Sequence, residues 1–338
     1  PKVVGRTPIL LNLVADSMHA IGVAVETTYI QGLIVNVNGD VVERLERPWT
    51  DTDQQTILNG IKEVIDQLLE KADERGLKIL GVGIGMHGII DSVRGICLFA
   101  PGFGWKNTPI IDELSQYYDL PVRIENNANT MALGERWFNN GLDVVSLTTI
   151  KIDQAIGAGI ILNRSLFVGE DFSAGEIGHF TVSLDGPLCN CGNYGCLETV
   201  ASIKGIVDRG KHLLNQGATS ELAKLVEGKP DKLSFFHICE AVALGDELTL
   251  QLLAEAGSYL GVAIANLLNI LNPKEVLIGG RIYPVVDYVL PKIREVVEQR
   301  SLEIPHTGVN IGPVTLGDDA VAIGATTLIF GDVFLWSI

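Results

Sequence analysis

Residues 174–179 read Ala-Gly-Glu-Ile-Gly-His, and residues 189–196 read Cys-Asn-Cys-Gly-Asn-Tyr-Gly-Cys. The first segment supplies an imidazole, and the second supplies three thiols at Cys-x-Cys and Cys-x4-Cys spacing. One histidine with three cysteines is the usual composition of a structural zinc site, and the glycines permit the tight turns that bring three sulfur atoms to one ion. We therefore predict that His179, Cys189, Cys191 and Cys196 bind Zn²⁺.

Disulfide bonds are the alternative for these cysteines. Cys189 and Cys191 are too close in sequence to bridge comfortably, and the other two cysteines, Cys97 and Cys239, lie in apolar segments where an inert core position is expected. The pattern suits a reducing compartment, and no secretory signal opens the sequence, so we expect a cytoplasmic protein.

The composition excludes several classes of function for this chain. Hydrophobic residues make up 47% and charged residues 20%, as in soluble globular proteins. The 25 Lys and Arg against 41 Asp and Glu give a net charge of −16, which repels a nucleic-acid backbone. The apolar segment 259–271 is too short to span a bilayer, and segment 321–338 is interrupted by glycine and aspartate, so no membrane insertion is expected.

Hydrophobic periodicity predicts two similar runs of strands and helices. Asn38-Gly39 between two apolar strands is a strong hairpin signal, and residues 54–72 place apolar side chains on one helical face. The expected strands are residues 9–14, 19–25, 29–37, 41–45, 79–84, 122–125, 144–152, 157–162, 165–168, 275–278 and 309–311; the expected helices are residues 54–72, 110–118, 128–138, 248–271, 285–299 and from 320 onward. Both runs share the order hairpin, strand, helix, so we expect two halves that pack with a ligand cleft between them.

The cysteine motif and the segment before it resemble the signature of the ROK family of sugar kinases and sugar-responsive repressors. The likeness covers nearly the whole chain and extends to Glu125-Asn126-Asn127-Ala128-Asn129, Leu133-Gly134-Glu135, Ala100-Pro101 with Trp105, and Ile278-Gly279-Gly280. It implies an α/β class with a duplicated actin-like ATPase (ribonuclease H-like) fold, two lobes and a central cleft. We expect a linker over residues 1–18. Residues 19–127 should form the first lobe, completed by a C-terminal helix over 320–338, and residues 128–319 the second lobe with the zinc motif and the dimerisation helices.

The resemblance also indicates that kinase chemistry has been lost. The kinase branch has an Asp-x-Gly-Gly-Thr phosphate loop, and this sequence has Ala24-Val25-Glu26-Thr27-Thr28 in its place, where the Glu26 carboxylate should repel a triphosphate. The second phosphate loop, Gly-Thr-Gly in kinases, corresponds to Asp153-Gln154-Ala155. The aspartate that acts as general base corresponds to Asn127, whose amide cannot take a proton at neutral pH. We therefore expect no catalytic residues and no enzymatic activity.

The sugar contacts of the family carry over to Asn126, Asn127, Glu176, His179 and Glu198. His179 would bind zinc through one ring nitrogen and a sugar hydroxyl through the other, so that the metal fixes the tautomer. Glu176 and Glu198 have the alternative role of supporting the metal site.

Two positions depart from the family pattern. Gly102 stands where many relatives have an asparagine that contacts sugar, and His87 stands where proline is common. For His87, a ligand contact and an ordinary loop histidine are equally compatible with the sequence.

These inferences predict the effector-binding and dimerisation region of a sugar-responsive transcriptional regulator that binds a monosaccharide and forms a homodimer or a higher homo-oligomer. Gly5-Arg6-Thr7-Pro8 resembles the segment that joins a winged helix-turn-helix domain to the actin-like part of family repressors, and the sequence begins at Pro1 rather than Met. We expect operator DNA to be bound through such an N-terminal domain, outside this chain. The alternatives are a sugar kinase with atypical phosphate loops and a regulator controlled by a protein partner.

Overall fold

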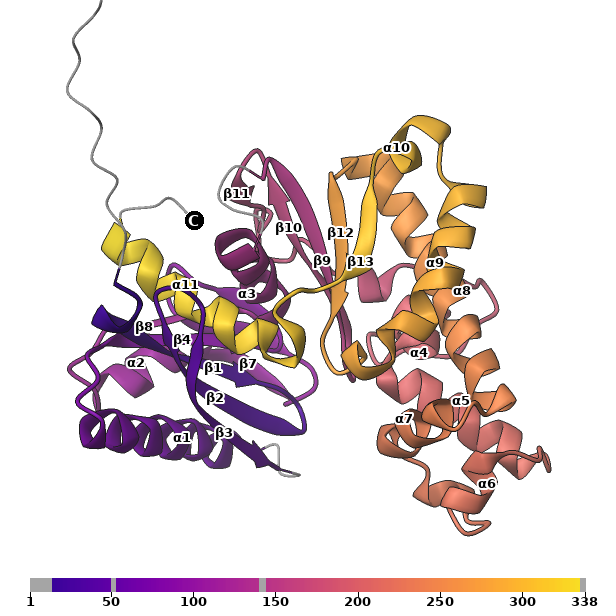
Figure 1. The fold of residues 1–338 in the computed structure, drawn as a ribbon, viewed down its shortest axis with the longest axis horizontal. Coiled ribbons are helices and arrows are strands. Elements are labelled where there is room, and N and C mark those ends of the chain that lie inside the picture. The colour runs from indigo at the N-terminus through magenta and orange to yellow at the C-terminus, as the bar shows by residue number, and fades with distance from the viewer. Residues whose placement is uncertain (1–13, 50–52, 140–143, 335–338) are drawn as a thin grey trace, which may run out of the picture.

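Two five-stranded sheets of the same topology form the framework of the fold (Figure 1). The computed structural model describes residues 14–49, 53–139 and 144–334. The first sheet has the order β3-β2-β1-β4-β8, from Val41–Pro48, Tyr29–Asn36, His19–Val25, Ile79–Met86 and Val122–Asn126. The second has the order β11-β10-β9-β12-β13, from Ser165–Leu166, Ile156–Leu162, Ser146–Ile152, Glu275–Gly279 and Asn310–Pro313.

Each sheet joins an antiparallel meander to two parallel strands. In the first sheet β1 and β3 pair antiparallel with β2, while β1, β4 and β8 are parallel; in the second sheet β9, β10 and β11 form the meander, and β9, β12 and β13 are parallel. The repeat of one connectivity confirms the expected duplicated α/β fold. The predicted hairpin at Asn38-Gly39 is confirmed as the turn between β2 and β3, where Gly39 adopts φ +92°.

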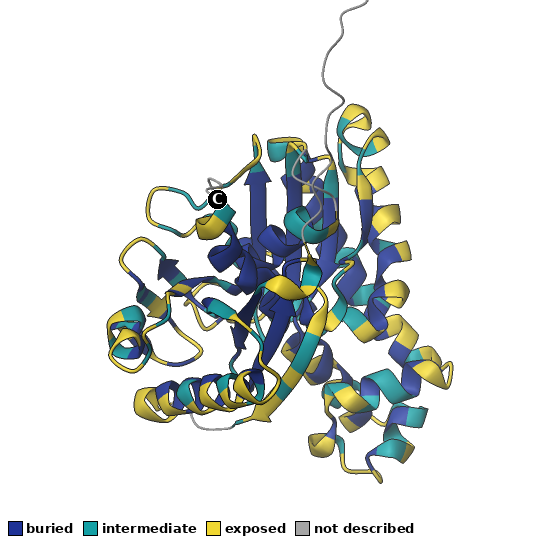
Figure 2. Ribbon diagram, turned by 60° about the vertical axis from the view of Figure 1, so that its left-hand side comes forward, coloured by how far each residue is buried: buried dark blue, intermediate teal, exposed yellow. Residues whose placement is uncertain are grey.

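The helices cover the sheets and fill the space between them. They are α1 (Gln54–Glu74), α2 (Ile110–Ser115), α3 (Asn127–Gly134), α4 (Leu197–Ala201), α5 (Ile203–Asn215), α6 (Glu221–Leu225), α7 (Phe235–Ala243), α8 (Glu247–Leu271), α9 (Val286–Arg300), α10 (Glu303–Thr307) and α11 (Ala320–Phe334). Figure 2 shows the central strands of both sheets buried and the outer helices exposed along one face, while the edge strand β3 is largely exposed. Helix α1 buries the apolar face that its sequence predicts.

Helix α11 returns from the C-terminal part of the chain to pack on the first sheet. A Cβ placed on Gly22 of β1 would lie 1.9 Å from the carbonyl oxygen of Ala322, and one on Gly83 of β4 would lie 1.9 Å from that of Ala325. A similar approach joins α11 to α3, because a Cβ on Gly324 would lie 1.9 Å from the Thr130 carbonyl oxygen. These glycines are required where the backbone of α11 touches those of β1, β4 and α3.

Helices of the second half pack around α8. Its buried residues belong to the same core as those of α9 and of strands β9, β10 and β12. By length and composition α8 is apolar enough to cross a membrane, but 56% of its most apolar window is buried inside the fold, as is typical of a core helix.

The differences from the sequence prediction are local. The helix expected over residues 128–138 is α3 followed by a π-helical turn over Glu135–Asn139, and the helix expected over 110–118 ends at Ser115. A three-stranded antiparallel sheet of β5 (Ile89–Asp91), β6 (Ile96–Ala100) and β7 (Trp105–Pro109) occupies a region for which the periodicity predicts no strand or helix. The strand expected over 9–14 and the Gly5–Pro8 junction lie, except for Val14, outside the described residues. The lobe boundaries stay a prediction.

Candidate functional site

A cavity of about 500 Å³ lies between the two halves of the duplicated fold. The first half contributes Thr27 from the turn after β1, His87 from the end of β4, and Asn126 and Asn127 where β8 runs into α3. The second half contributes Lys151 and Gln154 at the turn between β9 and β10, together with Glu176, His179, Cys191 and Glu198 from the cysteine-containing segment. The five side chains predicted to contact sugar therefore line one cavity, of a size that suits a small ligand.

The four predicted metal ligands converge beside this cavity. One ligand atom from each of His179, Cys189, Cys191 and Cys196 lies within 4.8 Å of the others. The Cys191 and Cys196 Sγ atoms are 3.7 Å apart, and Cys189 Sγ is 3.8 Å from His179 Nδ1. Tetrahedral zinc with bonds of about 2.3 Å to sulfur separates its ligand atoms by about 3.8 Å, so these two spacings match those of a tetrahedral site and the donor set could hold a metal ion. All five cysteines are free thiols, as expected.

The glycines of the motif create the turns that hold these ligands. Gly195 has φ +65°, and a Cβ at this position would lie 1.5 Å from the Ser183 carbonyl oxygen. The next residue, Cys196, pairs with Thr181 in an isolated β-bridge and caps the N-terminus of α4. Burial raises the pKa of the Cys196 thiol to about 12, so a bound cation would have to displace its proton.

His179 connects the cysteine cluster to the cavity. Its Nδ1 faces Cys189, and its Nε2 lies 3.9 Å from Glu176 Oε2 on the cavity side. Burial raises the pKa of both Glu176 and Glu198, and Glu198 Oε1 also lies 3.9 Å from Cys189 Sγ. Each carboxyl group is near both the metal ligands and the cavity, so the two roles considered for them are compatible.

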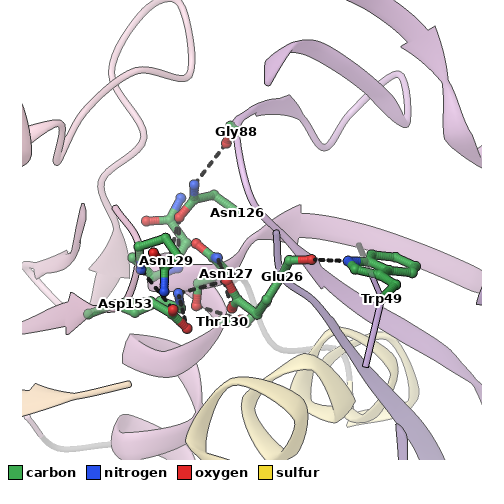
Figure 3. Close-up of polar contacts among 11 residues, drawn as sticks. Glu26, Trp49, Gly88, Asn126, Asn127, Asn129, Thr130 and Asp153 are labelled. Atoms are coloured by element: carbon green, nitrogen blue, oxygen red, sulfur yellow. Dashed lines mark hydrogen bonds and ion pairs between the residues drawn. The ribbon is translucent and has the colours of Figure 1, made fainter. Parts of the chain in front are cut away.

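Asn126 is largely occupied by contacts within the chain. Its Oδ1 accepts hydrogen bonds from the backbone N–H groups of Ala128 and Asn129 and thereby caps α3, and its Nδ2 donates to the Gly88 carbonyl oxygen at 2.8 Å (Figure 3). One N–H of the amide is left for a ligand.

Asn127 belongs to a buried polar cluster that joins the two halves. Its Nδ2 donates to both carboxylate oxygens of Glu26 at 3.0 Å (Figure 3). Lys151 Nζ lies 2.8 Å from Glu26 Oε2 and 3.7 Å from Asp153 Oδ2. Glu26, Lys151 and Asp153 expose 3%, 4% and 3% of their surface. The carboxylate expected to repel a phosphate is therefore paired with a lysine that the sequence analysis did not single out.

The charges of this cluster do not balance. Two carboxylates share one ammonium group, and burial raises the pKa of Glu26 to about 7, with Asp153 adding to the shift and Lys151 opposing it. The neighbouring carboxylates raise the pKa of Lys151 despite its burial, so the lysine stays charged. The missed signal was a lysine within the apolar strand 146–152, because a buried lysine needs a carboxylate partner.

Comparisons with known proteins place this chain in a family. The model described as ROK family matches residues 20–331. The xylose repressor of Caldicellulosiruptor bescii is 33% identical over 330 residues, which are 97% of this chain and 82% of the repressor. The crystal structure of a ROK family transcriptional regulator, described as a homolog of the E. coli MLC protein, has 28% identity and a TM-score of 0.80 and covers 94% of this chain and 80% of that one. A ROK family glucokinase from Streptomyces griseus, solved with glucose and AMPPNP, has 29% identity and a TM-score of 0.81 and covers 92% and 98%.

Proposed function

The chain belongs to the ROK family, and from that premise we propose that it is the effector-binding and dimerisation region of a sugar-responsive transcriptional regulator. The observation that carries the proposal is the buried cluster of Glu26, Lys151 and Asp153 at the two hairpin turns. These turns correspond to the phosphate loops of the kinase branch. In this chain the side chains of Glu26, Lys151 and Asp153 at these turns are buried and form ion pairs with each other.

The ligand class follows from the polar groups around the cavity. Amides, carboxyl groups and an imidazole all form hydrogen bonds with hydroxyl groups, and each sugar hydroxyl is both donor and acceptor. We propose that Asn126, Asn127, Glu176, His179 and Glu198 contact a monosaccharide. The Asn127 contact would use its Oδ1, because both close contacts of its Nδ2 are to Glu26.

We also propose that the His179, Cys189, Cys191 and Cys196 cluster binds zinc. The three sulfur atoms and the imidazole form a donor set that favours this ion. Zinc supplies a rigid structural centre. The chain's own contribution is His179, whose Nδ1 would face the ion while Nε2 points to Glu176 and the ligand, as in other metal-bound imidazoles whose second nitrogen has a fixed partner.

Regulation would follow from closure of the two lobes around the sugar. A ligand shifts a conformational equilibrium only by binding one state better than the other, and a cavity lined by both halves provides that difference. We propose that the chain forms a cytoplasmic homodimer with operator-binding domains N-terminal to this region. Closure would change the geometry of the dimer and therefore its fit to two DNA half-sites. Control by a protein partner is the alternative to this mechanism, and in it the cavity binds no sugar.

A sugar kinase is the second candidate, and its support is the similarity to the glucokinase structure. That reaction needs a base for the sugar hydroxyl and donors for the phosphates. Asn127 cannot act as the base, and the side chain of Glu26 cannot supply a positive charge to a phosphate group. The kinase candidate therefore predicts ATP turnover although Asn127, Glu26 and Asp153 stand at the positions of the base and of the two phosphate loops.

Calorimetric titration distinguishes the candidates. The zinc-loaded chain is titrated with D-xylose, D-glucose and N-acetyl-D-glucosamine, each with and without Mg-ATP. We expect one sugar to bind with an affinity that is indifferent to ATP. Binding that strengthens with ATP and is followed by ADP release would contradict the regulator and establish the kinase, and heat in none of the titrations would favour control by a protein partner.

A further inference from the structure

His87 and Gly102 share one wall of the cavity. The backbone N–H of His87 donates to the Val25 carbonyl oxygen at 3.1 Å, which ties the residue to the first sheet. Its ring stands edge-on to Phe103, with 5.8 Å between ring centroids and an interplanar angle of 87°. The neighbouring loop is held by the hydrogen bond from Asn126 to Gly88. The imidazole is therefore held in place through its backbone, through the contact with the Phe103 ring and through the next residue.

The absence of a side chain at Gly102 makes room for the imidazole of His87. A Cβ placed on Gly102 would lie 3.0 Å from His87 Nε2 and 2.7 Å from Thr27 Cγ2. The first distance is shorter than nearly all ordinary contacts of a Cβ, and the second requires a shift. A side chain at position 102 and an imidazole at position 87 thus compete for one volume, and this chain has the imidazole.

The ring nitrogens of His87 have no partner within the described part of the chain. The imidazole is half-buried, lines the cavity and forms no side-chain hydrogen bond with a described residue. Burial lowers its pKa to about 4, and the nearby charge of Lys151 contributes in the same direction. At neutral pH the ring is uncharged and offers one N–H donor and one nitrogen acceptor.

An uncharged donor and acceptor, held in place and facing a cavity, can recognise a hydroxyl group. Burying these two ring nitrogens without a partner costs free energy, so a ligand hydroxyl that binds them is favoured. The amides of Asn126 and Asn127 are each partly occupied, by the α3 cap and by Glu26, whereas neither ring nitrogen of His87 forms a hydrogen bond with a described residue. We propose that His87 is a specificity-determining residue that hydrogen-bonds one hydroxyl of the bound sugar, and that Gly102 is needed to admit its ring. The inference rests on the proposed sugar-binding function.

Deoxy sugars test this inference. The full chain, His87→Ala and His87→Gln are titrated with D-xylose, D-glucose and N-acetyl-D-glucosamine, and then with the monodeoxy analogues of the sugar that binds the unmodified chain. We expect His87→Ala to weaken that sugar by about tenfold, the usual effect of one neutral hydrogen bond, and His87→Gln to recover part of the loss. One deoxy analogue should bind the unmodified chain and His87→Ala equally well, because the hydroxyl that meets His87 is missing.

A purely structural role gives a different pattern. If His87→Ala weakens the parent sugar and every deoxy analogue by the same factor, or leaves all affinities unchanged, the inference about His87 is wrong while sugar binding stands. If none of the three sugars binds the unmodified chain, the proposed sugar binding fails, control by a protein partner is favoured, and the inference fails as well. Zinc content and melting temperature of each variant check that the fold is retained.

The pair of residues gives a second test through Gly102. We expect Gly102→Ala to weaken the sugar because its Cβ displaces the His87 ring, and we expect the same change to have a smaller effect in the His87→Ala background. Equal effects of Gly102→Ala in both backgrounds would show that the two positions do not compete, which overturns the role assigned to Gly102.

Discussion

Lys151 at the end of β9 forms an ion pair with Glu26, just after β1, with Nζ 2.8 Å from Oε2 although the residues lie 125 positions apart in sequence. The equivalent hairpins of the two repeats therefore meet through a buried charge pair, and Asp153 adds a second carboxylate 3.7 Å from the same Nζ. The one ammonium group is therefore the only positive charge of the cluster that offsets these two buried carboxylates.

Removal of the lysine should destabilise the chain. Lys151→Met leaves two buried carboxylates without a cation, and we expect a loss of about 3–5 kcal/mol in the free energy of unfolding. Chemical denaturation measures this change. Lys151→Met combined with Glu26→Gln and Asp153→Asn removes all the charges and should recover much of the loss. An equal loss in the single and triple variants would mean that packing of the lysine stem, rather than charge, stabilises this position.

The pH dependence of stability should contain a contribution from Glu26. A carboxyl group whose pKa is raised by folding, here from 4.5 to about 7, binds more protons in the folded chain than in the unfolded chain. Its contribution to stability is therefore full below about pH 4.5 and is lost as the pH rises to about 7. Between these pH values we expect Glu26 to account for a decrease on the order of 1–3 kcal/mol in the free energy of unfolding.

Other buried carboxyl groups with raised pKa, such as Glu125 and Glu135, act in the same direction, so the test is a difference between variants. Urea denaturation at several pH values compares the unmodified chain with Glu26→Gln and with Glu70→Gln, a change of an exposed residue on α1. The decrease in the free energy of unfolding with rising pH should be smaller in Glu26→Gln than in the unmodified chain and in Glu70→Gln. Parallel curves for all three proteins would show that Glu26 does not titrate in this range.

Metal removal should affect both stability and ligand binding. We expect one zinc ion per chain by elemental analysis, and none in Cys196→Ser, because this buried thiol lies 3.7 Å from Cys191 in the cluster. Without the ion, the orientation of His179 is lost, so sugar affinity should fall along with the melting temperature. Cys239→Ser, a change outside the cluster, is the control. Full sugar binding by a metal-free chain would separate the cysteine cluster from the ligand site.

Much of the framework could be predicted from the sequence, because its signals are local. The Asn38-Gly39 turn, the amphipathic face of residues 54–72 and the buried strand runs each depend on neighbouring residues. The weaker predictions were those that depend on tertiary contacts. Strands β6 and β7 have mixed burial, with Phe99 exposed and Cys97 buried, and do not show a clear alternation over enough residues to be recognised.

The site was predicted in its composition but not in its internal contacts. The cysteine spacing identified four residues that the structure brings together. The lysine that pairs with Glu26 could not be predicted by the same means, because the pairing depends on how two distant hairpins are oriented. Gly102 suggested a missing ligand contact, and only the three-dimensional arrangement shows that the His87 ring fills the space beside it.

A carboxylate at position 127 should not create a kinase. Asn127→Asp restores the residue type of a general base, but it replaces an amide that donates to Glu26 at 3.0 Å with a third acid in the cluster. Repulsion between the two carboxyl groups should raise the pKa of the pair and destabilise the chain, so the base would be partly protonated and badly placed. The turns at Glu26 and Asp153 still provide no phosphate contacts. We expect no ADP production from D-glucose and Mg-ATP in a coupled assay, for Asn127→Asp and for the isosteric control Glu26→Gln alike. Steady ADP release by Asn127→Asp that requires the sugar would show that the two turns can bind a triphosphate after all. The substitution of one amide by a carboxylate would then be enough to turn this chain into a kinase.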